Sequence, residues 1–305
     1  MTKDNLQRMS YIHVRGVEHY YEWIRTPAGS QNKPVMVFLH GWAGSARYWE
    51  STAKALSDTF DCLLYDMRGF GRSRQVSQLE SPLLEEPPVT AAEFTYEMEE
   101  YAEDLAAFLD ALQLSRVYIN AHSMGASVAT FFLNLYPERV EKAILTCSGI
   151  FEYDEKSFTQ FHTFGGYVVK FFRPRWLAQI PLMDKMFMKR FLYRPLPRAV
   201  SLAFLEDFIV ADKNAALNTI FTSVSKKAAE VMPHEFAKLK VPTLLIAGEH
   251  DIIIPAAMGR QAAALNDRVE YCEMRDTAHF PMLEDPETYL QRVREFLGVT
   301  SPANV

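Results

Sequence analysis

The sequence predicts an α/β fold with a mainly parallel, doubly wound sheet and an inserted helical cap. Short apolar runs alternate with longer segments of helical period along most of the 305 residues. Strands buried on both faces read as continuous apolar runs, and helical crossovers make neighbouring strands parallel. Residues 151–236 interrupt this alternation. We therefore expect them to form the cap, and residues 1–150 and 237–305 to form the core.

The expected core elements follow one another in a regular order. Residues 11–24 are aromatic and β-branched and are broken at Gly16, which is typical of a β-hairpin. Residues 74–92 contain three prolines and several glutamates and predict a long surface loop. Short apolar runs predict strands at 35–39, 62–65, 117–120, 143–146, 243–247 and 269–274, and helical spacing predicts helices at 46–56, 96–112, 124–135 and 286–297.

Composition and charge exclude several classes of protein. Apolar residues make up 49% of the chain and charged residues 23%, which excludes a disordered, collagen-like or polytopic membrane protein. No apolar run approaches the roughly 18 residues that a membrane span needs, and the polar N-terminal residues lack the apolar core of a secretory signal. The formal net charge of −6 argues against general nucleic-acid binding. A reducing cytoplasm is the expected compartment.

No pattern in the sequence indicates a cofactor or a metal. Cys62, Cys147 and Cys272 lack CxxC spacing and lie in apolar, strand-like segments, so we expect buried free thiols. Gly69-x-Gly71 follows a strand, but Arg74 stands where a dinucleotide loop needs its third glycine. We expect a structural turn there, and no metal site elsewhere in the chain.

The strongest indication of chemistry is the pentapeptide Ala121-His122-Ser123-Met124-Gly125. It lies directly after an expected strand and before an expected helix, and it approximates the G-x-S-x-G nucleophile elbow. Small residues two positions before and after the serine allow the strand and the helix to approach closely. We therefore expect Ser123 to be a nucleophile. The alternative is an ordinary serine at a helix N-cap.

A nucleophilic serine needs a base, and the base needs an orienting carboxylate. With such an elbow, the order along the chain is serine, acid, histidine. Asp251 follows the strand at 243–247 and His279 follows the strand at 269–274, so both should lie at the sheet edge that carries Ser123. We expect Asp251 to be the acid and His279 the base.

Four neighbouring residues are weaker candidates for these two roles. Glu249 or Asp276 could replace Asp251 as the acid. His250 is the nearest rival base, but its loop position fits packing or surface exposure better. His122 adjoins the serine, yet the tight turn should send its side chain elsewhere.

The developing oxyanion needs hydrogen-bond donors. The loop that begins at His40 follows the strand at 35–39, and one backbone N–H should come from this loop. The other should come from the residue after the nucleophile. We expect the N–H groups of Trp42 and Met124 to fill these roles, with Ala43 as a neighbouring alternative to Trp42. His40 should support the loop through hydrogen bonds.

Together these segments resemble the α/β-hydrolase superfamily over nearly the whole chain outside residues 151–236. The resemblance implies a hydrolase with a helical lid at the insertion. Ser123 separates the chain from haloalkane dehalogenases and epoxide hydrolases of this fold, which use aspartate. The matching landmarks are, in order, His40-Gly41, Asp66-x-Arg68-Gly69-x-Gly71-x-Ser73, the elbow at Ser123, Gly248-x-x-Asp251 and His279.

The insertion carries an unusual mixture of basic and bulky apolar residues. Between Val168 and Val200 there are eight basic residues and one acid, Asp184. Such a mixture is typical of an amphipathic surface that meets anionic lipid, and peripheral membrane contact is one expectation. The other is a helical cap whose basic residues are simply solvated. In either case its aromatic residues should line a lipophilic pocket.

We therefore expect a serine hydrolase that cleaves carboxylic esters with a lipophilic acyl or alcohol group. One alternative keeps the same three residues but changes the bond, giving a carbon–carbon bond hydrolase or a lactonase. Another is a hydrolase-like protein that binds a ligand without turnover. The sequence does not divide these groups, and it leaves the oligomeric state open.

Overall fold

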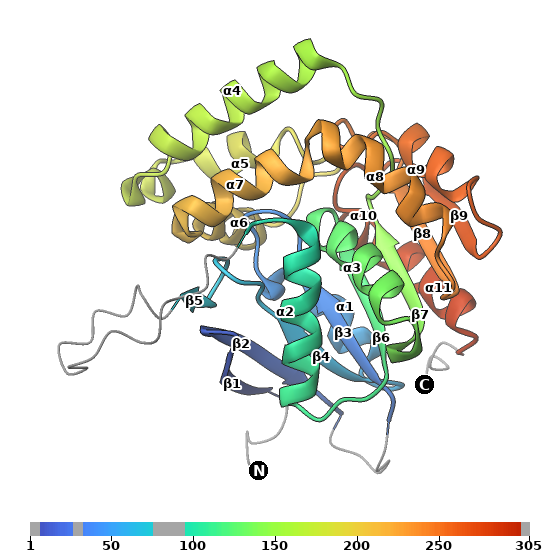
Figure 1. Ribbon diagram of the computed structural model, residues 1–305. Helices are drawn as coiled ribbons and strands as arrows, with labels where there is room; N and C mark the ends of the chain where they lie inside the picture. The colour runs from blue at the N-terminus through green and yellow to red at the C-terminus, as the bar shows by residue number, and fades with distance from the viewer. Residues whose placement is uncertain (1–6, 27–32, 76–94, 300–305) are drawn as a thin grey trace.

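A computed structural model describes residues 7–26, 33–75 and 95–299. Within these ranges one sheet has the strand order β1-β2-β4-β3-β6-β7-β8-β9, and the short β5 pairs with β2 (Figure 1). The hairpin strands β1 and β2 are antiparallel to their neighbours, including β5, and the strands β3, β4, β6, β7, β8 and β9 pair in parallel. The strands are β1 Gln7–Val14, β2 Val17–Ile24, β3 Val35–Leu39, β4 Asp61–Tyr65, β5 Arg74–Gln75, β6 Val117–His122, β7 Val140–Thr146, β8 Thr243–Gly248 and β9 Val269–Met274.

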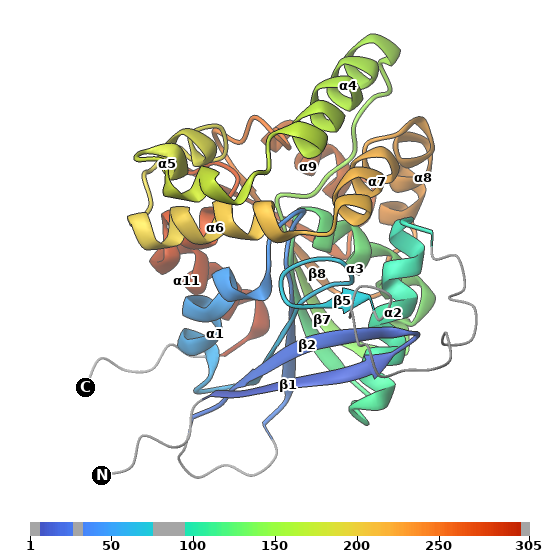
Figure 2. The ribbon, with the colours of Figure 1, turned by 90° about the vertical axis from the view of Figure 1, so that its left-hand side faces the viewer.

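Helices cover both faces of the sheet, so the predicted doubly wound α/β fold is confirmed. On one face α1 and α11 pack over Met36, Phe38 and Ile246; on the other α2, α3 and α9 enclose a second apolar core (Figure 2). The core helices are α1 Glu50–Leu56, preceded by the 3₁₀ turn Ala46–Trp49, α2 Met98–Ala111, α3 Met124–Leu135, α9 Ala256–Ala263, α10 Pro281–Glu284 and α11 Pro286–Leu297.

The predicted hairpin, strands and core helices are all present, and their ends differ by a few residues at most. Two short helices, α9 and α10, were not expected, because eight and four residues give too little periodicity to read. Most of the loop expected at 74–92 lies outside the described residues. Among the described residues, no helix is long and apolar enough to cross a bilayer.

The segment between β7 and β8 is helical, and its helices gather over one end of the sheet (Figure 2). This is the end at which the parallel strands finish, because α6 contacts the loop that follows β3. Loops at this edge carry the ligand sites of open α/β sheets. The helices are α4 Glu155–Phe171, α5 Met183–Met188, α6 Arg198–Val210, α7 Lys213–Ser223 and α8 Lys226–Ala237, with a 3₁₀ turn at Arg175–Gln179.

All three cysteines lie within the described residues and are free. Cys62 in β4 and Cys147 after β7 are buried, as expected. The expectation of burial was wrong for Cys272, which is partly exposed. The reason is its position on β9, the outermost strand of the sheet on that side.

Candidate active site

The turn between β6 and α3 holds Ser123 in an unusual backbone conformation. Its φ is 53° and its ψ is −121°, a region that side-chain-bearing residues rarely adopt and that is associated with functional strain. Gly125 allows this turn, because a Cβ there would lie 2.4 Å from the backbone oxygen of His40. The backbone of Gly41 also lies close to the elbow, since a Cβ added there would be 3.2 Å from the Cβ of Ser123. The elbow therefore depends on these two glycines.

Ser123, His279 and Asp251 form a continuous hydrogen-bonded chain. His279 Nε2 lies 3.1 Å from Ser123 Oγ, and His279 Nδ1 lies 2.7 Å from Asp251 Oδ2. The second carboxylate oxygen of Asp251 accepts the backbone N–H groups of Ile253 and Ile254, at 2.8 and 3.0 Å. Burial raises the pKa of Asp251, but His279 and these donors outweigh burial and hold the pKa below its ordinary value. Asp251 thus presents a carboxylate to the imidazole.

The alternative acids and the alternative base do not take part in this hydrogen-bonded chain. Glu249 and Asp276 are exposed, and the Glu249 carboxylate accepts the backbone N–H of Asp276. His250 is also exposed and stacks on Tyr193, with the two ring centroids 4.1 Å apart. Asp251 alone of the three acids contacts the His279 side chain among the described hydrogen bonds.

Close backbone packing holds the two loops that carry Asp251 and His279 together. A Cβ on Gly248, at the end of β8, would lie 2.0 Å from the backbone oxygen of Ala278. The N–H of His250 donates to Thr277 O at 2.8 Å. Glycine at position 248 is therefore required for the loops of Asp251 and His279 to meet.

The two residues expected to supply oxyanion donors are chain neighbours of residues at the elbow. Met124 is the first residue of α3, and the first N–H groups of a helix have no partner within the helix. Trp42 follows Gly41, which contacts Ser123, and the Trp42 indole N–H donates to Ala216 O on α7 at 2.8 Å. His40 braces this loop as expected: its Nδ1–H donates to Gly41 O, and its Nε2 accepts the N–H of Met67. The roles of Trp42 and Met124 as donors stay predictions.

His122 has a role that the sequence did not reveal. Its side chain turns away from Ser123 Oγ, as expected, but its Nε2–H donates to the backbone oxygen of His279 at 2.7 Å. Its Nδ1 must then accept the Tyr48 hydroxyl at 2.9 Å, and that hydroxyl accepts the N–H of Gly41. Burial lowers the pKa of His122 well below its ordinary value, so the ring is neutral. This network links the loop that begins at His40 to the backbone of His279.

Glu284 is a second residue that sequence reasoning missed. Its buried carboxylate accepts the N–H of Ala278, next to the base, at 2.9 Å. The other oxygen accepts the N–H groups of Tyr193 and Arg194, at 2.7 and 2.8 Å. Glu284 therefore ties the segment after α5 to the loop of His279. No motif marks such a residue, because Tyr193 and Arg194 lie about 90 positions away along the chain.

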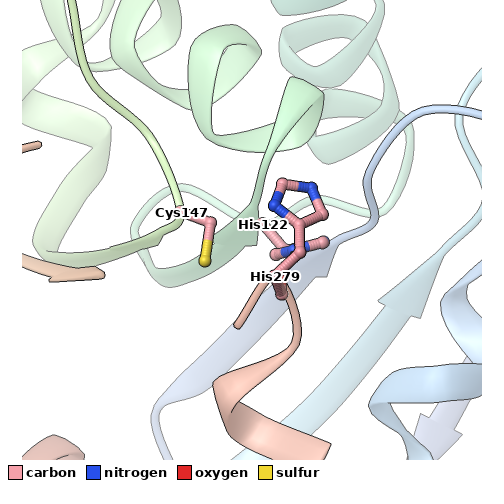
Figure 3. Close-up of side chains that lie close together, drawn as sticks. All are labelled: His122, Cys147 and His279. Carbon is pink, nitrogen blue, oxygen red and sulfur yellow. Dashed lines mark hydrogen bonds between the residues drawn. The ribbon is translucent and has the colours of Figure 1, made fainter. Parts of the chain in front are cut away.

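The side chains of His122, Cys147 and His279 cluster at the ends of β6 and β7 and before α10 (Figure 3). Their donor atoms would suit a metal by distance alone. Both nitrogens of each histidine, however, already have hydrogen-bond partners. Burial also raises the pKa of the Cys147 thiol well above its ordinary value, whereas a metal ligand must be a thiolate. This cluster does not fit a metal ion.

Asp207 on α6 anchors the inserted helices to the core. Its buried carboxylate accepts Ser45 Oγ at 2.8 Å and pairs with Arg47 at 2.8 Å. Burial raises the pKa of Asp207 to about 6, although Arg47 and Ser45 oppose this rise. In the unfolded chain the same carboxyl has an ordinary pKa near 4.

We expect Asp207→Asn to flatten the pH dependence of unfolding. An acid whose pKa is raised on folding contributes most stability below its unfolded pKa and loses it as the pH rises through the folded pKa. At about 1.4 kcal/mol for each unit of pKa difference, the wild type should lose about 3 kcal/mol relative to Asp207→Asn between about pH 4 and pH 7. Urea unfolding at several pH values measures this difference. Glu206→Gln, which changes an exposed neighbour, should show the same change of unfolding free energy with pH as the wild type. If Asp207→Asn also showed the wild-type pH dependence, the expectation would be wrong.

Comparison with known proteins places this chain in a family. The family model for the alpha/beta hydrolase fold matches residues 34–286, so the chain belongs to the α/β-hydrolase family and the predicted superfamily is confirmed. The uncharacterized hydrolase YugF of Bacillus subtilis (strain 168) is 24% identical over 291 residues, which cover 93% of this chain and 96% of YugF.

Many solved structures share the fold, among them two enzymes. An esterase from Exiguobacterium antarcticum aligns with a TM-score of 0.74 and 19% identity, over 95% of this chain and 99% of its own. The enol-lactonase from Burkholderia xenovorans LB400 aligns with a TM-score of 0.72 and 23% identity, over 95% of this chain and 100% of its own. At these identities the likeness concerns the fold.

Proposed function

We propose that the protein is a serine hydrolase that cleaves carboxylic esters with a lipophilic acyl or alcohol group. The observation that carries the proposal is the hydrogen-bonded chain from Ser123 Oγ through His279 to Asp251. A serine hydroxyl is a weak nucleophile until a neighbouring base takes its proton. Here the base is within reach of the hydroxyl and is itself oriented by a carboxylate.

In the proposed reaction, Ser123 Oγ attacks the ester carbonyl while His279 Nε2 takes its proton. The N–H groups of Trp42 and Met124 stabilise the oxyanion of the tetrahedral intermediate. His279 then protonates the leaving alcohol, and an acyl ester remains on Ser123. A water molecule, activated by His279, hydrolyses this ester and releases the acid. Asp251 keeps the Nδ1–H tautomer of His279 and stabilises its charged form.

Aromatic rings on the inserted helices support a lipophilic substrate. Phe191 lies 6.1 Å from the ring of His279, and Phe187 and Phe208 continue the row to Trp42 with centroid distances between 5.2 and 5.8 Å. This row joins the base to the oxyanion loop across the cap. We propose that residues 151–236 form this cap. We also propose that its aromatic rings line the apolar wall of a pocket that holds the acyl or alcohol group.

The proposal predicts activity toward 4-nitrophenyl esters that rises with chain length from acetyl to medium or long acyl groups. The physical reason is burial of methylene groups against the aromatic row, worth up to about 0.8 kcal/mol each. Release of 4-nitrophenol, with Ser123→Ala as the control, measures it. If wild type and variant are equally inactive on every chain length, the ester proposal fails. Lactones assayed in parallel then test the cyclic-ester alternative, which the same three residues can serve.

A further inference from the structure

Helix α4 has two apolar faces, and only one of them is packed. Phe158, Gly166 and Val169 face the protein, and the two glycines of α4 lie against Ile220, Leu217 and Phe221 of α7. On the opposite face Phe164, Tyr167 and Phe171 are 69, 55 and 65% exposed. Figure 1 shows α4 on the outer surface of the helical layer, at the end of the molecule away from the hairpin strands β1 and β2.

Large exposed apolar side chains continue along the chain from the end of α4 into the segments that follow. Soluble proteins rarely expose so many large apolar side chains within one short stretch. We call this surface, together with its exposed basic residues, the basic aromatic face. Its apolar members are Tyr167, Phe171, Phe172, Trp176, Leu182 and Met186, each more than half exposed, and its basic members are Lys170, Arg175, Lys185, Lys189 and Arg190.

The charge of this face is of one sign. The single acid between residues 168 and 200, Asp184, is buried, so the exposed charges interleaved with the aromatic side chains are all basic. Glu152 and Glu155 are exposed near the start of α4, but a helix rises 1.5 Å per residue, which places Glu155 about 24 Å from Phe171. In a chain of net charge −6, this concentration of positive charge is local.

We infer that the basic aromatic face binds the surface of an anionic phospholipid bilayer. Exposed aromatic and methionine side chains would enter the region between headgroups and acyl chains, while the long lysine and arginine side chains reach the phosphates. A purely apolar face would suit many partners. The alternation of apolar side chains with exclusively basic ones suits a surface that is both lipophilic and negatively charged. Binding at this face does not depend on hydrolysis at Ser123.

Cosedimentation with vesicles tests the inference. We expect the wild type to bind vesicles of phosphatidylglycerol and phosphatidylcholine and to bind pure phosphatidylcholine much more weakly. Tyr167→Ser/Phe171→Ser/Trp176→Ser should reduce binding to the mixed vesicles about tenfold or more, because the apolar contact is lost. Tyr11→Ser, a half-exposed aromatic on β1, is the control and should bind as the wild type does.

A second pair of variants tests the electrostatic contribution to vesicle binding. Lys185→Glu/Arg190→Glu should abolish the preference for anionic vesicles, whereas Arg116→Glu/Arg268→Glu, the same charge change before β6 and β9, should retain it. Thermal melting of each variant verifies folding, and Ser123→Ala should bind vesicles normally. A wild type that stays in solution with both vesicle types would overturn the inference. Unchanged binding by Tyr167→Ser/Phe171→Ser/Trp176→Ser would also overturn it, as would a wild-type dimer that this triple variant dissociates while neither protein binds lipid.

Discussion

Ser123→Ala is expected to lower kcat by about six orders of magnitude and to leave the fold intact. The variant removes the hydroxyl that the proposed reaction acylates, while alanine keeps the short side chain that the elbow tolerates. Hydrolysis of the best 4-nitrophenyl ester measures the loss, and circular dichroism verifies the fold.

The matched control for this variant is Ser127→Ala, one turn later on α3. Its hydroxyl takes no part in the hydrogen-bonded chain of His279, so activity should stay close to wild type. Comparable activity of Ser123→Ala and wild type would show that another group attacks the substrate.

Asp251→Asn should lower kcat by about four orders of magnitude, the second largest effect expected. The amide can donate to Nδ1 of His279 and so favours the wrong tautomer, which leaves Nε2 protonated and unable to take the serine proton. The amide also provides no charge to stabilise the imidazolium. Rates over a range of pH, measured with a chromogenic ester, give the size of the loss.

Asp276→Asn is the control for the second prediction, because Asp276 is an exposed acid three residues before His279 in sequence. It should change the rate less than about tenfold, as expected for a screened surface charge. If Asp276→Asn or Glu249→Gln abolished activity while Asp251→Asn did not, the assignment of the acid would be wrong.

The sheet and the three central side chains were accessible from the sequence because each depends on local patterns. A strand such as 35–39 is a continuous apolar run, and the order serine, acid, histidine places three loops at one sheet edge. The close approach of Gly125 to His40 is likewise anticipated by the small residue in the elbow.

The supporting network could not be predicted in the same way. Tyr48, His122 and Glu284 act through contacts that join segments tens of residues apart, and a single sequence does not reveal which polar groups will meet. Asp207 is a similar case, because only the packing of α6 on the loop after β3 reveals its burial.

The central claim is that Ser123 is the nucleophile, and intact-protein mass spectrometry after reaction with a fluorophosphonate tests it most directly. An activated serine attacks the phosphorus of the reagent, as it would attack the carbonyl of an ester. Fluoride leaves, and the phosphonyl group stays bound to the serine. We predict one adduct on the wild type, mapped by peptide sequencing to Ser123, and none on Ser123→Ala; the adduct should form far more slowly on Asp251→Asn. A wild type that hydrolyses esters but carries its adduct on another residue, or carries none, would contradict the account.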